Sequence, residues 1–245
     1  MIEVYNLVKK YNEKEILHDI SFTIKSGEVV SYLGPNGAGK TTTLYIVSTL
    51  VKPTSGSIFL NGYNLEIDSK DIRKIIGCVF DDFGLYPGLT VNKNLNFIGS
   101  LYAITKEERK RRISNLLNFF ELNEYKSTII AKLSKGTKQK VSLAKSLLHD
   151  PEILFLDEPT SGLDPVASKN ILDLIKSMKK SGKTILMTTH LLEKAEVISD
   201  KIIILNKGKI IFDGLASDIS HKKSTKSLEE LFFDLIGSNH VNNSI

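Results

Sequence analysis

One short segment constrains the fold of this chain more than any other. It fits the pattern G-x-x-x-x-G-K-[ST] and reads Gly34-Pro35-Asn36-Gly37-Ala38-Gly39-Lys40-Thr41. A mostly apolar run, Val29–Leu33, precedes it as a buried strand should, and a helical segment follows it toward Leu50. A strand, a glycine-rich loop and a helix in this order predict an α/β fold whose loop cradles a phosphate group.

Each residue type in this loop has a chemical reason. Glycines let successive backbone N–H groups point inward as an anion nest, and the following helix presents its partly positive N-terminus. We predict that Lys40 reaches the β- and γ-phosphates of a nucleotide and that the Thr41 hydroxyl ligates Mg²⁺. Thr42, at the same helix end, is a further predicted nucleotide-binding residue. The alternative, a chance glycine loop, does not explain the flanking strand and helix.

Two carboxylates follow a second apolar run. Asp157 and Glu158 come directly after Ile153–Leu156, where a buried strand is expected to end. Asp157 can hold Mg²⁺ through its water shell, and Glu158 can orient or deprotonate a water that attacks the γ-phosphate. The alternative is that Asp157 and Glu158 are ordinary acidic residues at the end of a strand. This alternative is weaker because the same chain also carries a phosphate-binding loop.

Composition limits the class of protein. The chain has 245 residues, with 33 Lys and Arg against 28 Asp and Glu, a length that allows one large domain or two small ones. Apolar residues at 41% and charged residues at 25% exclude a disordered acidic chain and a fibrous one. The net charge of +5 leaves anionic ligands and membrane surfaces open. No apolar run approaches the roughly 18 residues that cross a bilayer, no signal peptide opens the chain, and the lone Cys78 favours a reducing cytosol.

Strand patterns fill the first and last thirds of the chain, and helical patterns fill the middle. Beside the two buried strands, the expected strands are Ile2–Leu7, Ile20–Ile24, Ser57–Leu60, Thr184–Met187, Lys201–Leu205 and Lys209–Phe212. The expected helices are Val91–Ile104 with Thr90 as N-cap, a helix from the capping box Thr105–Glu108 to Phe120, a helix from Asp164-Pro165 to Ser181-Gly182, Leu191–Ile198, and a helix from Ser227 to Leu235 before a frayed end at 238–245. One α/β core with a helical insertion is the simplest arrangement.

Further segments resemble those of the ATP-binding subunit of an ABC transporter, and along the chain they occur in the order that this family shows. Leu133-Ser134-Lys135-Gly136-Thr137 resembles the signature loop of that family, and Ser161-Gly162-Leu163-Asp164 resembles its D-loop. His190 stands where the family has its switch histidine, and Tyr11 stands where the family has the aromatic residue that stacks on adenine. The resemblance spans nearly the whole chain.

The resemblance implies a P-loop NTPase core with an antiparallel β subdomain and a helical ABC-type insertion. A single ABC ATP-binding domain is expected over 1–245, with its core at about 1–84 and 147–215. The helical insertion is expected at about 85–146 and a C-terminal extension at about 216–245.

The resemblance also implies roles for individual residues. Lys40, Glu158 and His190 are the expected catalytic residues, and Tyr11 is expected to stack on the base rather than serve only as a strand-edge aromatic. Ser134 is a helix N-cap in either interpretation, and in the family that helix end faces ATP held by a second subunit. Ser134, Gly136 and Asp164 are therefore expected to complete a partner's site in a homodimer that sandwiches two ATP molecules.

Two positions depart from the family pattern. Asp81 stands where the family has a glutamine that contacts Mg²⁺ and the transport channel, which adds negative charge beside the phosphates. The signature loop has Lys135 at its third position and Thr137 in place of its final glutamine. Because Ser134 and Gly136 remain, we expect the contact with the partner's ATP to survive.

The expected function is ATP hydrolysis that drives a separate integral membrane subunit, a permease. The segment Gly84–Val91, the signature loop and residues 227–232 resemble the cassettes of two-component bacterial exporters. Leu85, Tyr86 and Leu89 are expected contacts of the membrane subunit, and the alternative is a loop that packs on its own helices. The expected cofactors are ATP and Mg²⁺, and the expected location is the cytoplasmic face of the cell membrane, with no nucleic acid bound.

Two alternatives are weaker. A soluble ABC ATPase that acts on ribosomes or nucleic acid generally carries two cassettes or long coiled-coil insertions, and this chain has one glycine-rich loop and no sustained heptads. A small-molecule P-loop kinase has no use for a signature loop or a D-loop.

Overall fold

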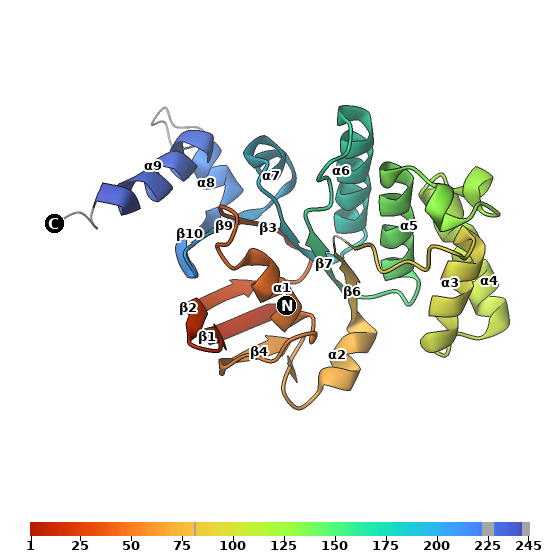
Figure 1. Cartoon of the computed structure of the whole chain (residues 1–245), viewed down its shortest axis with the longest axis horizontal. Coiled ribbons are helices and arrows are strands. Elements are labelled where there is room, and N and C mark those ends of the chain that lie inside the picture. The colour runs from red at the N-terminus through yellow and green to blue at the C-terminus, as the bar shows by residue number, and fades with distance from the viewer. Residues whose placement is uncertain (81, 222–227, 242–245) are drawn as a thin grey trace. The chain divides into compact units, whose positions relative to one another are not determined.

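The computed structural model describes residues 1–80, 82–221 and 228–241 (Figure 1). The chain forms two compact units, one made of Met1–Ile72 with Thr184–Ile245 and the other of Arg73–Lys183. We call them unit 1 and unit 2. The predicted single domain, with boundaries near residues 84, 147 and 215, stays a prediction.

The first sheet of unit 1 is antiparallel. Its strands β1 (Ile2–Tyr11), β2 (Lys14–Ile24), β4 (Ser55–Leu60) and β5 (Tyr63–Asn64) lie in the order β2-β1-β4-β5. The hairpin of β1 and β2 extends further than the sequence pattern predicts, to the pair Tyr11 and Lys14. An ion pair of 3.0 Å between Lys10 and Glu15 links the two strands near their turn. This sheet is the predicted antiparallel β subdomain.

The other strands of unit 1 surround the strand that leads into the glycine-rich loop. The completely buried β3 (Val29–Leu33) pairs in parallel with β8 (Thr184–Thr188) and β9 (Lys201–Asn206). An antiparallel strand, β10 (Lys209–Leu215), follows β9 after a tight turn. The predicted strands β3, β8, β9 and β10 are confirmed. Because β3 lies between β8 and β9, the end of β3 has buried strands on both sides.

The helices of unit 1 are α1 (Lys40–Val47), α7 (Leu192–Ile198), α8 (Ala216–His221) and α9 (Leu228–Val241). In α9, Leu228 is buried against Leu33, Ile202 and Ile204, and Leu231 and Leu235 pack on the same cluster. The predicted end of this helix at Leu235 is wrong, because α9 continues to Val241. The predicted N-cap, Ser227, lies outside the described residues.

Unit 2 combines a strand pair with the helices from the middle of the chain. The strand β6 (Ile76–Val79) lies parallel to β7 (Ile153–Asp157), with Ile76 opposite Ile153. Its helices are α3 (Val91–Leu101), α4 (Lys106–Phe119), α5 (Lys135–Leu147) and α6 (Pro165–Lys180), with the short turns η1 (Asn123–Tyr125) and η2 (Ile130–Lys132). The helix α2 (Ser69–Ile75) runs across the boundary between the units. Within the described part of the chain, no helix is both long and apolar enough to cross a membrane.

Four helices of unit 2 begin at residues that the sequence identified. Side-chain oxygens of Thr90, Thr105, Ser134 and Asp164 accept hydrogen bonds from backbone N–H groups three residues further on, at 3.2, 3.4, 3.1 and 2.9 Å. These caps satisfy N–H groups that have no partner within the helix. The helical character of the middle of the chain is therefore confirmed, although α3 ends at Leu101 rather than Ile104.

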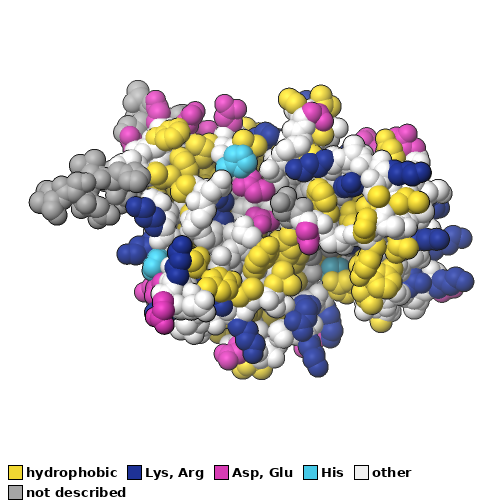
Figure 2. Space-filling model, in the orientation of Figure 1, with side chains coloured by type: hydrophobic (Ala, Val, Ile, Leu, Met, Phe, Trp, Pro, Cys, Tyr) yellow, Lys and Arg dark blue, Asp and Glu magenta, His cyan; other side chains and the backbone are white. Residues whose placement is uncertain are grey.

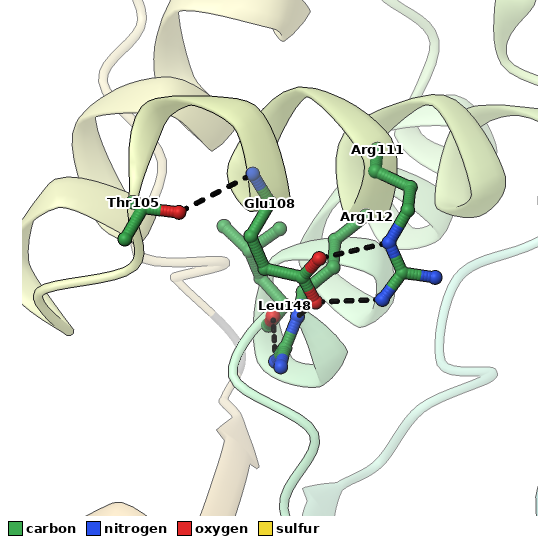
Figure 3. A network of polar contacts seen from close by, with 5 residues as sticks. All are labelled: Thr105, Glu108, Arg111, Arg112 and Leu148. Atoms are coloured by element: carbon green, nitrogen blue, oxygen red, sulfur yellow. Dashed lines mark hydrogen bonds and ion pairs between the residues drawn. The ribbon is translucent and has the colours of Figure 1, made fainter.

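One half of the predicted capping box is wrong. Thr105 accepts the bond from the Glu108 N–H, but the Glu108 carboxylate binds Arg111 and Arg112 instead of returning to the Thr105 amide (Figure 3). Its oxygens lie 2.7 and 2.8 Å from the Arg111 guanidinium and 2.7 Å from Arg112 Nε. Arg112 also donates to the Leu148 carbonyl oxygen at 3.2 Å, which joins α4 to the end of α5.

The Glu108 network should make stability depend on acid pH. Hydrogen bonds from Arg111 and then Arg112 lower the pKa of the Glu108 carboxyl to about 2. A carboxyl with a lowered pKa stabilises the folded state above its ordinary pKa of 4.5, and this contribution disappears as the pH falls toward 2. In urea titrations, the difference in unfolding free energy between wild type and Glu108→Gln should therefore be constant at neutral pH and shrink below pH 4.5.

Glu107→Gln is the matched control, because it removes a neighbouring carboxylate of α4 and leaves the network of Glu108 intact. A Glu108→Gln difference that stays the same from pH 7 down to about 2 would contradict the ion-pair role.

Candidate nucleotide-binding site

The glycine-rich loop in unit 1 follows β3 and turns into α1 at Lys40. Gly34 has a backbone φ of 154°, and a Cβ atom built on it would lie 2.2 Å from the carbonyl oxygen of Leu205 in β9. This approach is closer than any side chain tolerates, because the atom it meets belongs to the backbone of a buried strand. Gly34 therefore lets the loop lie directly against β9.

Two backbone segments hold the other end of the loop. A Cβ on Gly39 would lie 2.6 Å from a methyl group of the Leu17 side chain of β2, and the backbone φ of 108° at this position favours glycine. The N–H of Gly208, in the turn between β9 and β10, donates to the carbonyl oxygen of Ala38 at 3.0 Å. The Gly208 carbonyl oxygen accepts from the His18 N–H at 2.9 Å. The loop thus takes its shape from the hairpin strand β2 and from the β9–β10 turn.

Lys40 lies inside the curl of the loop. Its side chain is buried, with 7% of the residue exposed, and its Nζ donates to the carbonyl oxygens of Gly34 at 2.7 Å and Pro35 at 3.2 Å. Gly39 has no side chain to cap α1, and the first turn of the helix carries one lysine and three threonines rather than a carboxylate. The positive end of this helix is therefore available to an anionic group.

Unit 1 also carries the two other residues predicted to meet the nucleotide. Tyr11 ends β1 and is 46% exposed, and the hairpin that carries it packs through Leu17 against Gly39 of the loop. His190 follows β8 and is exposed. Unit 1 therefore holds the glycine-rich loop, Tyr11 and His190, together with Thr41 and Thr42 in the first turn of α1.

The two predicted carboxylates belong to unit 2. Asp157 is the last residue of β7 and is buried, with 7% of the residue exposed. Glu158 is half-buried and has a backbone φ of 46°, a left-handed conformation that costs energy for a residue with a side chain. Its carbonyl oxygen accepts from the Ser161 N–H at 3.0 Å. Such strain concentrates at functional sites, where the surrounding structure holds the side chain in one direction.

Unit 2 brings the signature loop and the D-loop to one cavity. The cavity has a volume of about 340 Å³, and Ser134, Gly136 and Asp164 all line it. A Cβ on Gly136 would lie 3.3 Å from the Cβ of Ala167, so α5 and α6 come close at this point. The N-terminal ends of two capped helices, α5 and α6, thus open on the same cavity.

Sequence reasoning missed several residues that shape these loops. Leu205 and Gly208 form walls of the glycine-rich loop, and Thr137 forms a 2.8 Å hydrogen bond between its hydroxyl and that of Ser134. The one signal in the sequence was Gly208, which lies between the predicted strands Lys201–Leu205 and Lys209–Phe212. Asp81, which replaces the family glutamine, lies outside the described residues.

Two predicted magnesium ligands carry donor atoms that suit this ion, and their joint binding of it stays a prediction. Thr41 supplies a hydroxyl oxygen and Asp157 a carboxylate, the hard oxygen ligands that Mg²⁺ prefers, and the ion usually takes only one or two carboxylates together with substrate phosphates. The described residues contain no cluster of three or more His, Cys, Asp or Glu that could hold a metal.

Comparison with known proteins identifies the family. The family model described as ABC transporter matches residues 17–161. The chain belongs to this family. It is 36% identical over 231 residues to the linearmycin resistance ATP-binding protein LnrL of Bacillus subtilis. The aligned region covers 94% of this chain and 74% of that protein.

Solved structures agree with this family. An ATP-binding subunit of an ABC transporter superposes with a TM-score of 0.86 and 34% identity over 96% of this chain and 99% of that one. A dimeric ATP-binding cassette, MJ0796, bound to ADP and phosphate, superposes with a TM-score of 0.79 and 31% identity over 88% of this chain and 99% of that one. The chain is thus the ATP-binding subunit of an ABC transporter and an ABC-type ATPase, and the predicted P-loop NTPase fold is confirmed.

Proposed function

We propose that this ABC subunit hydrolyses ATP to power export of a substrate through a separate membrane-spanning subunit. The observation that carries the proposal is the cavity of unit 2, which joins a signature loop to a D-loop. These two loops serve a cassette that closes on a second cassette, and a self-contained kinase has no use for them. The similarity to a protein named for linearmycin resistance supports the direction of transport.

In this proposal each site residue has one chemical role. Lys40 binds the β- and γ-phosphates, and Thr41 and Asp157 would hold Mg²⁺, which would supply neutralisation of the phosphate charge. The Glu158 carboxylate accepts a proton from the water that attacks the γ-phosphorus, and His190 donates a hydrogen bond to the γ-phosphate. The bond from the γ-phosphorus to the β–γ bridging oxygen breaks, and ADP leaves. Catalysis then comes from positioning and from charge neutralisation around the transferred phosphoryl group.

The nucleotide is shared between two copies of the chain. Residues Gly34–Thr42 enclose the phosphates in one copy, and Tyr11 stacks on the adenine. Ser134, Gly136 and Asp164 of the other copy face the γ-phosphate, because the N-terminus of α5 attracts an anion and Ser134 adds a hydroxyl. The dimeric state of the similar cassette MJ0796 supports a homodimer.

The membrane subunit docks on the helical part of unit 2. Hydrophobic side chains gather on the surface there (Figure 2), and Tyr86, Phe97, Leu101 and Tyr102 are between 40% and 65% exposed. The Tyr86 ring packs edge-on against Phe97 with centroids 4.9 Å apart, while its N–H donates to Asn94 Oδ1 at 2.8 Å. The backbone before α3 is thus held firmly while the Tyr86 ring stays accessible. Leu85 and Leu89 are half-buried and contribute less surface.

A membrane-spanning partner also sets where this chain works and how its metal site is linked to transport. The chain works at the cytoplasmic face of the membrane, as one ABC domain over 1–245 with a helical insertion at about 85–146. Asp81 adds negative charge where the family has a neutral glutamine, which weakens the link between the metal site and the membrane subunit.

Purification from detergent-solubilised membranes tests the proposal. We expect the wild-type chain to be recovered with an integral membrane protein, and reconstitution of the two in vesicles to raise ATP hydrolysis. Tyr86→Glu should abolish this recovery because a carboxylate replaces an apolar contact. Tyr63→Glu, which alters a tyrosine of β5 with a similar 41% exposure, is the control and should leave the recovery unchanged.

The alternative function, action on ribosomes or nucleic acid, predicts that a different molecule copurifies with the chain. An ABC ATPase that acts on ribosomes or nucleic acid would be recovered with RNA or DNA, and added salt would release it. That result, without a membrane protein, would overturn the transport proposal.

A further inference from the structure

The Tyr11 ring already has a cation on one of its faces. The ammonium group of Lys9 lies 4.6 Å from the centre of that ring, within the range of a cation–π interaction. The pairing of β1 with β2 shifts register between Lys9 and Lys10. Irregularities of this kind re-aim side chains next to functional sites. Lys9 therefore occupies a face of the residue that is proposed to bind the base.

Lys9 is anchored rather than loose. Its Nζ donates to the carbonyl oxygen of Lys52 at 2.8 Å, and the residue is half-buried. Two more hydrogen bonds tie the same stretch of β1 to the segment after α1. The Thr54 N–H donates to the Val8 carbonyl oxygen at 2.9 Å, and the Lys10 N–H donates to Thr54 Oγ1 at 2.9 Å. The ammonium group is therefore fixed both to the ring and to the backbone beyond it.

This arrangement has an electrostatic consequence for the ring. An aromatic face is electron-rich, so a cation on one face is attracted to it and restricts the rotation of the side chain. A base can then stack on the opposite face of a ring that is already in position, and less conformational freedom is lost on binding.

We propose that Lys9 is a positioning residue for nucleotide binding, which holds Tyr11 so that its other face receives a purine base. The inference rests on the proposed role of Tyr11. It also links the two ends of the nucleotide, because Lys52 lies in the segment that leaves α1 and the first turn of α1 carries Lys40. One short chain segment thus connects the base-binding strand to the phosphate-binding helix.

Equilibrium binding of ATP and of inorganic tripolyphosphate tests the inference, since tripolyphosphate has no base. Lys9→Met keeps the length of the side chain and removes its charge. We expect it to weaken ATP binding about two- to fivefold, the range of an exposed cation–π contact, and to leave tripolyphosphate binding unchanged. The KM for ATP should rise while kcat stays constant, and Lys9→Arg should restore binding because guanidinium also stacks on aromatic rings.

Three controls separate the possible outcomes. Lys25→Met removes an equal charge from an exposed position before β3 and should change neither affinity. In a Tyr11→Ala background, Lys9→Met should have no further effect on ATP binding, because Lys9 acts through the ring. Thermal unfolding of each variant shows whether the hairpin is intact.

Other results overturn the inference. Unchanged or tighter ATP binding by Lys9→Met would mean that the base does not use a ring held by Lys9, or that it displaces Lys9. Equal losses for ATP and tripolyphosphate would show a general charge effect. If Tyr11→Ala binds ATP as well as wild type does, the proposed stacking role of Tyr11 fails, and the inference about Lys9 fails with it.

Discussion

Glu158→Gln should bind ATP normally and hydrolyse it about 10²- to 10⁴-fold more slowly than the wild type, the usual contribution of a general base. Glutamine has the same shape as glutamate but accepts no proton at neutral pH. The backbone at this position is left-handed, with φ at 46°, and the side chain follows the buried end of β7. The substitution therefore removes the proton acceptor and keeps the geometry that places it.

The trapped nucleotide should also reveal the dimer. Because ATP is hydrolysed so slowly, Glu158→Gln should accumulate as an ATP-bound dimer, visible as a doubled mass in light scattering, whereas wild type returns to monomer as ATP is spent. Phosphate release in single-turnover conditions measures the rate directly. Glu66→Gln, which changes an exposed carboxylate after β5, is the matched control and should behave as wild type. Wild-type turnover by Glu158→Gln would exclude Glu158 as the general base.

Gly34→Ala should reduce ATP affinity by about 10- to 10²-fold, because the loss of one hydrogen bond to a charged phosphate costs about 1.5–3 kcal/mol. The added methyl group would lie 2.2 Å from the carbonyl oxygen of Leu205, so the loop has to move away from β9. That movement breaks the alignment of the inward-pointing N–H groups and shifts Lys40 at the end of the loop. Calorimetric titration with ATP measures the loss, and circular dichroism shows whether the fold persists.

Gly37→Ala provides the matched control within the same loop. Gly37 also has a positive φ, at 78°, so both substitutions strain the backbone. Among the described residues, however, a methyl group on Gly37 would meet nothing within 4 Å. We expect Gly37→Ala to bind ATP much more tightly than Gly34→Ala. Equal affinities for the two variants would show that contact with β9 does not shape the loop.

Several elements of the fold followed directly from local patterns. The caps Thr90, Ser134 and Asp164 were predicted because each bonds to an N–H group only three residues away. The strand β3 was predicted with its observed bounds, because five apolar or small residues before a glycine loop leave few alternatives. The β6 strand was missed, because its four residues acquire strand geometry only by pairing with β7.

Local patterns failed where a side chain had more than one partner within reach. Glu108 had the spacing of a capping box, yet two arginines on the next turn of α4 provide stronger, charge-assisted bonds to its carboxylate. The helix α9 continues past Leu235 to Val241, further than the polar character of residues 238–245 indicates.

The sequence alone predicted the chemistry that we propose for the candidate site. The glycines, Lys40 and Thr41 form a pattern whose phosphate-binding character depends on residues next to one another, and Asp157 and Glu158 follow a recognisable apolar run. Only the tertiary structure showed that Leu205 closes one side of the loop and that Lys9 lies over Tyr11 while bonded to Lys52. Such contacts depend on the order and register of strands that are distant in the chain, which no local spacing encodes.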